Sequence, residues 1–66
     1  MNKTELQAEM KRKGFTYETM SKALGISENG FWRKVNGIND FTLPEIQIII
    51  EKLNLNDEKI KIIFFS

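Results

Sequence analysis

The sequence predicts an all-α fold of five short helices. Apolar residues recur at helical spacing in five segments, and the single proline and the glycines fall at the edges of these segments, where helices begin and end. No stretch before the last few residues alternates between apolar and polar residues as a strand does. A chain of 66 residues is long enough for one domain, 1–66, with one small core.

The first helix is expected from Asn2 to Gly14. Asn2 is a typical N-cap residue, and Glu5, three residues later, completes the pattern of a capping box. Leu6 and Met10 lie one turn apart and are expected to form the buried face of this helix.

Two shorter helices are expected next. The second covers 16–25 and begins at the N-cap residue Thr16, and the third covers 28–36, between the cap Ser27 and the C-cap Gly37. Each has one apolar face at helical spacing. The buried residues of the two helices are expected to be Met20, Ala23, Leu24, Phe31 and Val35.

The fourth helix has the clearest pattern. Thr42 and Glu45 form a capping box around Pro44, and Asn54 suits a left-handed C-cap. A regular apolar stripe marks its buried face. The stripe consists of Leu43, Ile46, Ile49, Ile50 and Leu53.

The tail "LNDEKIKIIFF" fits two structures. Ile60, Ile63 and Phe64 have the spacing of a helix capped by Asn56, whereas Ile60, Ile62 and Phe64 alternate as in a strand. We favour a fifth short helix.

Composition restricts the classes of function. The chain has no histidine and no cysteine, no phosphate-binding glycine-rich loop and no pair of carboxylates that marks an acid–base site. We therefore expect no metal site, no cofactor and no enzymatic activity. The chain also lacks the apolar run of a signal peptide or of a membrane span, so we expect an intracellular protein without a membrane partner.

The charge is unevenly distributed along the chain. Residues 1–39 hold seven Lys/Arg against four Asp/Glu, whereas residues 40–66 hold three against five. The front part therefore carries a net charge of +3 and the rear part −2, which suits a basic working half on an acidic support.

The second and third helices have the layout of a helix-turn-helix over 16–37. Ala23 and Gly25 allow the two helices to cross closely, and Ile26 is expected to insert the turn into the core. With Phe31 and Val35 turned inward, helical spacing places four side chains on the outer face of the third helix. These are Glu28, Asn29, Trp32 and Arg33.

The outer residues suit base recognition in DNA. Arginine pairs bidentately with guanine in the major groove, asparagine pairs with adenine, and a carboxylate such as that of Glu28 accepts from cytosine. Trp32 fits a thymine methyl group or the sugar-phosphate wall, but tryptophan is also rich in protein-interface hot spots. Contact with DNA, contact with a protein partner and packing against the core all stay open for Trp32.

The stretch "MSKALGISENGFWRKVNGIN" resembles the lambdoid phage Cro proteins and repressor N-terminal domains, and the wider Xre-type regulators. The similarity runs from Glu5 to Leu55, and "FTLPEIQIIIEKL" is similar to the fourth helix of that family. The resemblance implies a lambda-repressor-like DNA-binding domain. It also implies a temperate bacteriophage or prophage setting, in the cytoplasm of a bacterial host whose low-GC genome would suit the Lys/Ile/Asn-rich composition.

The resemblance also implies roles for individual residues. Glu28, Asn29 and Arg33 match the base-reading positions of the family's recognition helix. Tyr17 would sit near a phosphate, close to the positive end of the second helix. The other residues that would approach the DNA backbone or the groove edge are Ser27, Lys34, Asn36 and Asn39.

Two functions are consistent with these observations. The first is a Cro-like regulator that binds double-stranded operator DNA as a homodimer, with two recognition helices in successive major grooves. The C-terminal segment 56–66 would supply the dimer contact, because its apolar residues exceed what so small a domain easily buries. The second is a small phage modulator, antirepressor-like, whose same surface binds a partner repressor of the CI type. The predicted dimer contacts are Ile48, Ile62, Phe64 and Phe65.

Overall fold

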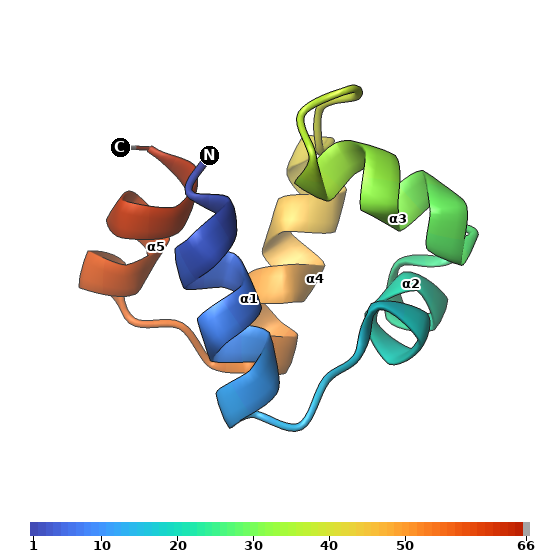
Figure 1. Cartoon of the computed structure of the whole chain (residues 1–66). Coiled ribbons are helices and arrows are strands. Elements are labelled where there is room, and N and C mark those ends of the chain that lie inside the picture. Colours follow the sequence, from blue (N-terminus) through green and yellow to red (C-terminus); the bar gives the residue numbers. More distant parts are fainter. Residues whose placement is uncertain (66) are drawn as a thin grey trace.

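The computed structural model describes residues 1–65, which form five helices and no strand (Figure 1). The all-α class is therefore confirmed over this range, and the tail is helical rather than extended. Ser66, the last residue of the predicted domain 1–66 and of segment 56–66, lies outside the described residues. The helices are α1 (Lys3–Arg12), α2 (Tyr17–Leu24), α3 (Glu28–Val35), α4 (Leu43–Leu53) and α5 (Asp57–Phe64).

Every helix begins at a side chain that caps its free amides. The capping oxygen accepts a hydrogen bond from the backbone N–H three residues later, which satisfies one of the donors that a helix start leaves unpaired. Four of the helices end in a residue with positive φ. This residue is the C-cap itself in α2 and α4, Gly25 and Asn54, and the residue after the C-cap in α1 and α3, Gly14 and Gly37. The C-cap of α3 is therefore Asn36 and not the predicted Gly37. The capping residues are those predicted: Asn2, Thr16, Ser27, Thr42 and Asn56.

The start of α1 departs from the predicted capping box. The side chain of Asn2 accepts from the N–H of Glu5, but the Asn2 N–H donates to the carbonyl oxygen of Ile63 at 2.7 Å. The Glu5 carboxylate instead faces Lys59 of α5 at 3.4 Å. Both groups are used to join α1 to α5, so the reciprocal half of the box does not form.

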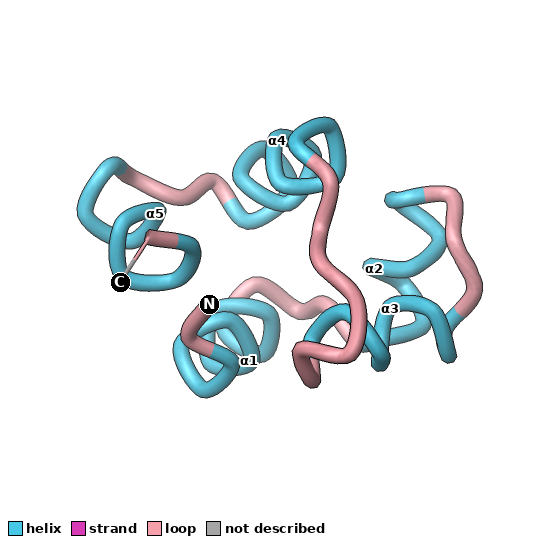
Figure 2. Tube along the Cα trace, turned by 90° about the horizontal axis from the view of Figure 1, so that it is seen from above, coloured by secondary structure: helices cyan, strands magenta, loops and turns pink. Residues whose placement is uncertain are grey.

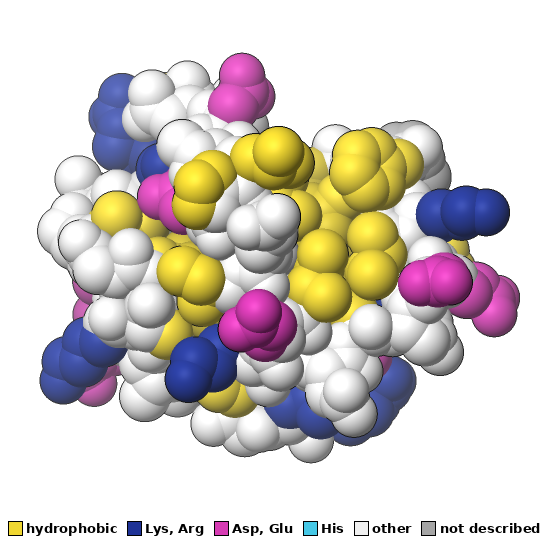
Figure 3. Space-filling view, turned by 180° about the vertical axis from the view of Figure 1, so that it is seen from behind, with side chains coloured by type: hydrophobic (Ala, Val, Ile, Leu, Met, Phe, Trp, Pro, Cys, Tyr) yellow, Lys and Arg dark blue, Asp and Glu magenta, His cyan; other side chains and the backbone are white. Residues whose placement is uncertain are grey.

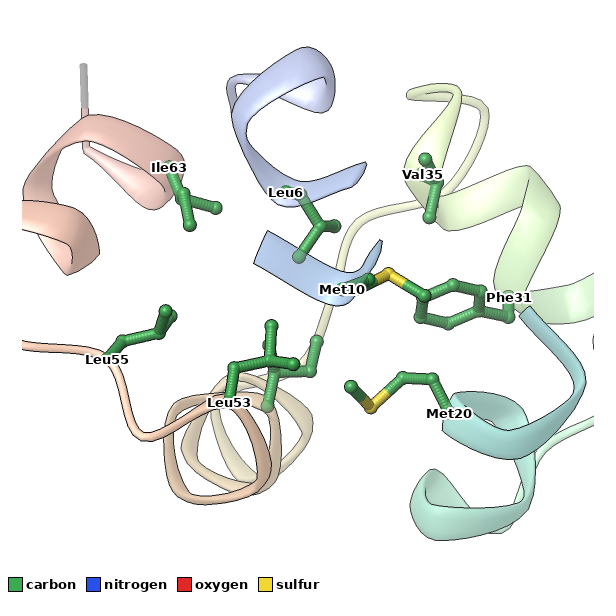
Figure 4. Packing of buried hydrophobic residues seen from close by; sticks show 9 residues of the cluster. Leu6, Met10, Met20, Phe31, Val35, Leu53, Leu55 and Ile63 are labelled. Atoms are coloured by element: carbon green, nitrogen blue, oxygen red, sulfur yellow. The ribbon is translucent and has the colours of Figure 1, made fainter. Parts of the chain in front are cut away.

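The core lies between two groups of helices. Figures 1 and 2 show α1, α4 and α5 on one side and α2 with α3 on the other, with the two chain ends close together. Leu6 and Met10 of α1 occupy the middle of the core, between Ile63 of α5 and Phe31 of α3 (Figure 4). The buried apolar residues are Leu6, Met10, Met20, Phe31, Val35, Ile49, Leu53, Leu55 and Ile63.

Leu43 is a correction to the predicted stripe of α4. Its side chain is 67% exposed, whereas Ile49 and Leu53 are fully buried. Leu43 lies about 80° around the helix axis from Leu53 and directly follows the cap, so it stands at the edge of the stripe and outside the core.

Candidate functional site

The turn between α2 and α3 fixes how the two helices cross. Gly25 has φ of 73°, a left-handed conformation that glycine adopts at little cost, and so ends α2. Ile26 then donates its N–H to the carbonyl oxygen of Ser21 at 3.0 Å, and its half-buried side chain packs against the core. Ser27 caps α3. The predicted roles of Ile26 and Ser27 are confirmed. The role predicted for Gly25 is wrong, because a Cβ atom there would meet nothing within 4 Å, so this glycine is needed for its positive φ and not for a close approach of the two helices.

The prediction that the glycines lie at helix edges is wrong for Gly30, which lies inside the first turn of α3. A Cβ atom there would come within 3.1 Å of the Ser27 Oγ, which accepts the Gly30 N–H at 2.9 Å. Glycine therefore leaves room for the cap of this helix. Ser27, a predicted DNA-backbone contact, is exposed, and its hydroxyl group can still donate one hydrogen bond.

The inward face of α3 is held by aromatic contacts. The ring of Phe31 is fully buried and meets Tyr17 of α2 edge to face, with centroids 5.1 Å apart. It meets Phe41 in the same way at 5.7 Å. Val35, one turn later, is also buried. These contacts fix the rotation of α3 about its axis, so that its other side faces outward.

The outward face carries the four residues predicted for recognition. Glu28, Asn29 and Arg33 are exposed, and the Trp32 side chain is 47% exposed. The structure therefore brings all four together on one side of α3. Within residues 1–65, the side chains of Glu28, Asn29 and Trp32 make no hydrogen bond or ion pair.

Arg33 is oriented by Asn39. The Arg33 Nε–H donates to the Asn39 Oδ1 at 3.0 Å, and the N–H groups of Ile38 and Asn39 donate to the Arg33 carbonyl oxygen at 2.9 and 3.3 Å. The left-handed Gly37 turns the chain so that Asn39 reaches back. The two terminal amino groups of the guanidinium stay unpaired within the described residues and form a planar fork.

Lys34 does not join this surface. Its Nζ lies 2.6 Å from the Glu45 Oε1, and both side chains are less than a fifth exposed. Burial by itself raises the pKa of the Glu45 carboxyl, but the hydrogen bonds from Lys34 and Thr42 and the charge of Lys34 outweigh it, so the pKa lies below its ordinary value. Because this ammonium group neutralises a carboxylate inside the domain, we remove Lys34 from the set of predicted phosphate contacts.

Asn36 is also used within the domain. Its Nδ2 donates to the Trp32 carbonyl oxygen at 2.9 Å, and its Oδ1 accepts from the Lys3 Nζ at 2.7 Å. It therefore caps the last turn of α3 and connects it to α1. Tyr17 is half-buried, and its hydroxyl oxygen accepts from Gln7 Nε2 at 2.9 Å, so that its hydroxyl group can still donate one hydrogen bond.

A surface hollow lies beside the first turn of α3. It has a volume of about 410 Å³ and is lined by Tyr17, Glu28, Asn29 and Trp32. Sequence reasoning singled out all four residues but did not predict a hollow. The Tyr17 and Trp32 rings come from different helices, so only the crossing of α2 and α3 brings them together.

The predicted dimer contacts do not share one outward face. Ile62 and Phe64 flank the buried Ile63 and lie about 200° apart around α5, and both are half-buried. Ile48 of α4 is half-buried too, whereas Phe65 is 69% exposed. Hydrophobic side chains nevertheless gather on the rear of the molecule, over α4 and α5 (Figure 3).

Residues 1–65 contain neither a metal-binding cluster nor a helix that could span a membrane. This range contains no group of three or more Cys, Asp, Glu or His side chains placed to hold a metal ion. None of its helices combines the length and the apolar character needed to cross a bilayer.

No protein-family model, curated protein or solved structure matches this chain.

Proposed function

We propose that the protein is a DNA-binding transcriptional regulator of the Cro type that places α3 in the major groove of operator DNA. The observation that carries this proposal is the Arg33–Asn39 pair on the outward face of α3. With its Nε–H held by Asn39, the guanidinium presents its two terminal amino groups end-on, which is a geometry that matches O6 and N7 of guanine. The α2–turn–α3 unit then acts as a helix-turn-helix.

The neighbouring residues complete the proposed interface. Asn29 lies one turn before Arg33 on the same ridge and suits an adenine. Tyr17 and Ser27 contribute neutral donors to phosphates at the edge of the groove. Asn39, which was predicted to contact the DNA backbone, instead orients Arg33. Binding, without catalysis or a cofactor, is the proposed activity, and the setting that we propose is a phage or prophage genetic switch.

Charge makes the proposed interface weak for one protomer. Among the cations of residues 1–39, three face carboxylates and Lys13 donates to the Leu53 carbonyl oxygen at 2.6 Å. If two or three cations reach phosphates, the logarithm of the affinity should fall with the logarithm of the salt concentration with a slope of about −2 to −3. We therefore propose a homodimer, in which two such interfaces act together.

The proposed dimer uses the apolar rear face over α4 and α5 (Figure 3). Among the four predicted dimer contacts, Phe65 is the most exposed. Sedimentation equilibrium of the wild type and of Phe65→Ser tests this part. A dimer that the substitution weakens supports it, and a wild-type monomer at the concentrations that bind DNA contradicts it.

The test of the main proposal is fluorescence anisotropy with labelled duplexes. One duplex carries the DNA that flanks the protein's own gene and the other a scrambled sequence, each measured over a salt series. We expect tighter binding to the flanking DNA, and Arg33→Ala should reduce this preference by about 1 to 3 kcal/mol. Equal binding to both duplexes would contradict the proposal.

A second candidate function keeps the fold but changes the target. The hollow beside Trp32 has no Lys or Arg in its lining and contains one carboxylate, a charge that opposes DNA. This observation favours a phage modulator whose α3 surface binds a repressor protein of the CI type. Adding that repressor to the anisotropy assay tests this function, because a modulator shifts the repressor's own binding curve.

A further inference from the structure

We infer that the hollow formed by Tyr17, Glu28, Asn29 and Trp32 is a receptor for an arginine side chain of a protein partner. The inference rests on the second candidate function and names the chemistry by which such a partner is recognised. The hollow, about 410 Å³ in volume, is large enough for a guanidinium group and its methylene stem.

The walls of the hollow suit a planar cation. The rings of tryptophan and tyrosine carry negative π faces that attract a cation placed over them, and an arginine also stacks on them through its flat guanidinium. Lysine has a compact, strongly hydrated ammonium group that cannot stack in this way. The aromatic lining therefore favours arginine over lysine.

The carboxylate of Glu28 supplies a counter-charge. Glu28 is exposed, lines the hollow and has no hydrogen-bond or ion-pair partner among residues 1–65. It stands at the first position of α3, whose amino end carries a partial charge of roughly +0.5. One full negative charge outweighs this partial charge, so the mouth of the hollow is negative and complements a cation.

The Tyr17 wall of the hollow is fixed before any ligand arrives. The Tyr17 ring packs against the buried Phe31 at 5.1 Å, and its hydroxyl group is held by Gln7 at 2.9 Å. The backbone at Trp32 is held at its carbonyl oxygen by the Nδ2 of Asn36. A preformed wall reduces the ordering cost of binding, which matters for an anchor of one side chain.

DNA is a poorer occupant of this hollow. A phosphate would meet the Glu28 carboxylate without a Lys or Arg in the lining to offset the repulsion. A protein partner that exposes arginine meets complementary charge and two aromatic rings. DNA-binding proteins themselves expose arginine, so a repressor surface has the required chemistry.

The test uses Trp32 as its own reporter, because it is the single tryptophan of the chain. The full-length protein is titrated with acetyl-Gly-Arg-Gly-amide and, at matched ionic strength, with the same peptide containing citrulline, the neutral isostere of arginine. We expect a saturable change in tryptophan fluorescence with the arginine peptide. The citrulline peptide should bind about fivefold more weakly or worse, because it lacks the charge. Equal responses would overturn the inference.

A pair of variants separates the site from general charge effects. Glu28→Gln should raise the midpoint of the arginine titration about threefold to tenfold. Glu18→Gln removes the same charge from an exposed position of α2 outside the lining, and should leave the midpoint within about twofold. Circular dichroism checks that both variants fold. Equal effects of the two substitutions would overturn the inference.

The same variants keep this inference separate from the DNA proposal. If Glu28→Gln weakens arginine binding while the duplex preference of the protein is retained, the hollow and the Arg33 ridge serve different ligands and both proposals stand. If duplex DNA, but not the arginine peptide, saturably changes Trp32 fluorescence and Glu28→Gln strengthens that binding, the hollow is a DNA contact and the inference is overturned.

Discussion

The two faces of α3 differ in what holds their side chains. Phe31 and Val35 on the inward face are 0% and 2% exposed and pack within the core. Glu28, Asn29 and Trp32 on the outward face make no side-chain hydrogen bond within residues 1–65 and are all exposed. The side chains of these three residues therefore contribute no hydrogen bond or ion pair to the fold of the described residues. Substitutions on the inward face should therefore change stability, and substitutions on the outward face should change binding.

The largest effect is expected from Phe31→Ala. The substitution removes a fully buried ring that contacts both Tyr17 and Phe41, so we expect a loss of about 3 to 5 kcal/mol in the free energy of unfolding. Urea denaturation followed by circular dichroism measures it. A loss below about 1 kcal/mol would show that α3 is not anchored by this face.

The next largest effect on stability is expected from Lys34→Met. Lys34 was predicted to face DNA, so a loss of stability here would place it with the residues that hold the fold and not with the binding surface. The methionine keeps the aliphatic stem but leaves the Glu45 carboxylate mostly buried without its charged partner, at a cost of about 2 kcal/mol at neutral pH. The matched control is Lys34→Met combined with Glu45→Gln, which keeps an acceptor for the Thr42 N–H. The double variant should be more stable than Lys34→Met alone.

The same ion pair predicts a pH dependence. The pKa of Glu45 is lowered in the folded protein by its partners, so the pair stabilises the fold fully above the ordinary pKa that a glutamate has in the unfolded chain. This stability is lost as the pH falls from there through the lower pKa of the folded state. Urea midpoints measured between neutral pH and pH 3 should therefore decline more steeply for the wild type than for Lys34→Met. Parallel declines would argue against the ion pair.

A smaller effect, on binding alone, is expected from Asn39→Ala. Arg33 keeps its charge but loses the hydrogen bond that orients its guanidinium, so affinity for the preferred duplex should fall by about 1 kcal/mol. Affinity for scrambled DNA should barely change, because a phosphate contact tolerates a mobile arginine. An equal loss on both duplexes would mean that Asn39 contributes to phosphate binding and not to base recognition.

The smallest effect on stability is expected from Trp32→Ala. With the side chain about half exposed and without a side-chain hydrogen bond in residues 1–65, the free energy of unfolding should change by no more than about 0.5 kcal/mol. Urea denaturation beside Phe31→Ala provides the comparison. A loss above about 2 kcal/mol would place Trp32 with the core residues and remove it from the binding surface.

The features that could be predicted from the sequence are those determined by residues close together along the chain. The caps Thr16, Ser27 and Thr42 act on amides three residues away, so their spacing along the chain was enough to place the helix starts. The buried pair Phe31 and Val35 followed from helical periodicity in the same way. These features needed no knowledge of the tertiary arrangement.

Contacts between segments that are not neighbours along the chain left no comparable spacing pattern in the sequence. Glu5 looked like half of a capping box, but Lys59, 54 positions later, is its partner. Lys34 looked like a surface cation, but its partner is Glu45, 11 positions later at the start of α4. The hollow between Tyr17 and Trp32 likewise depends on the angle between two helices. Sequence reasoning therefore identified the residues of the site better than their partners.

The most direct test of the proposed recognition face is a ¹H–¹⁵N correlation titration of the protein with duplex DNA that flanks its own gene. We expect the largest shifts at Arg33 and Asn39, and at Asn29 one turn before Arg33, with the core amides of α5 unchanged. Shifts confined to α4 and α5, or none at low salt, would contradict the assignment of α3 as the DNA-reading helix.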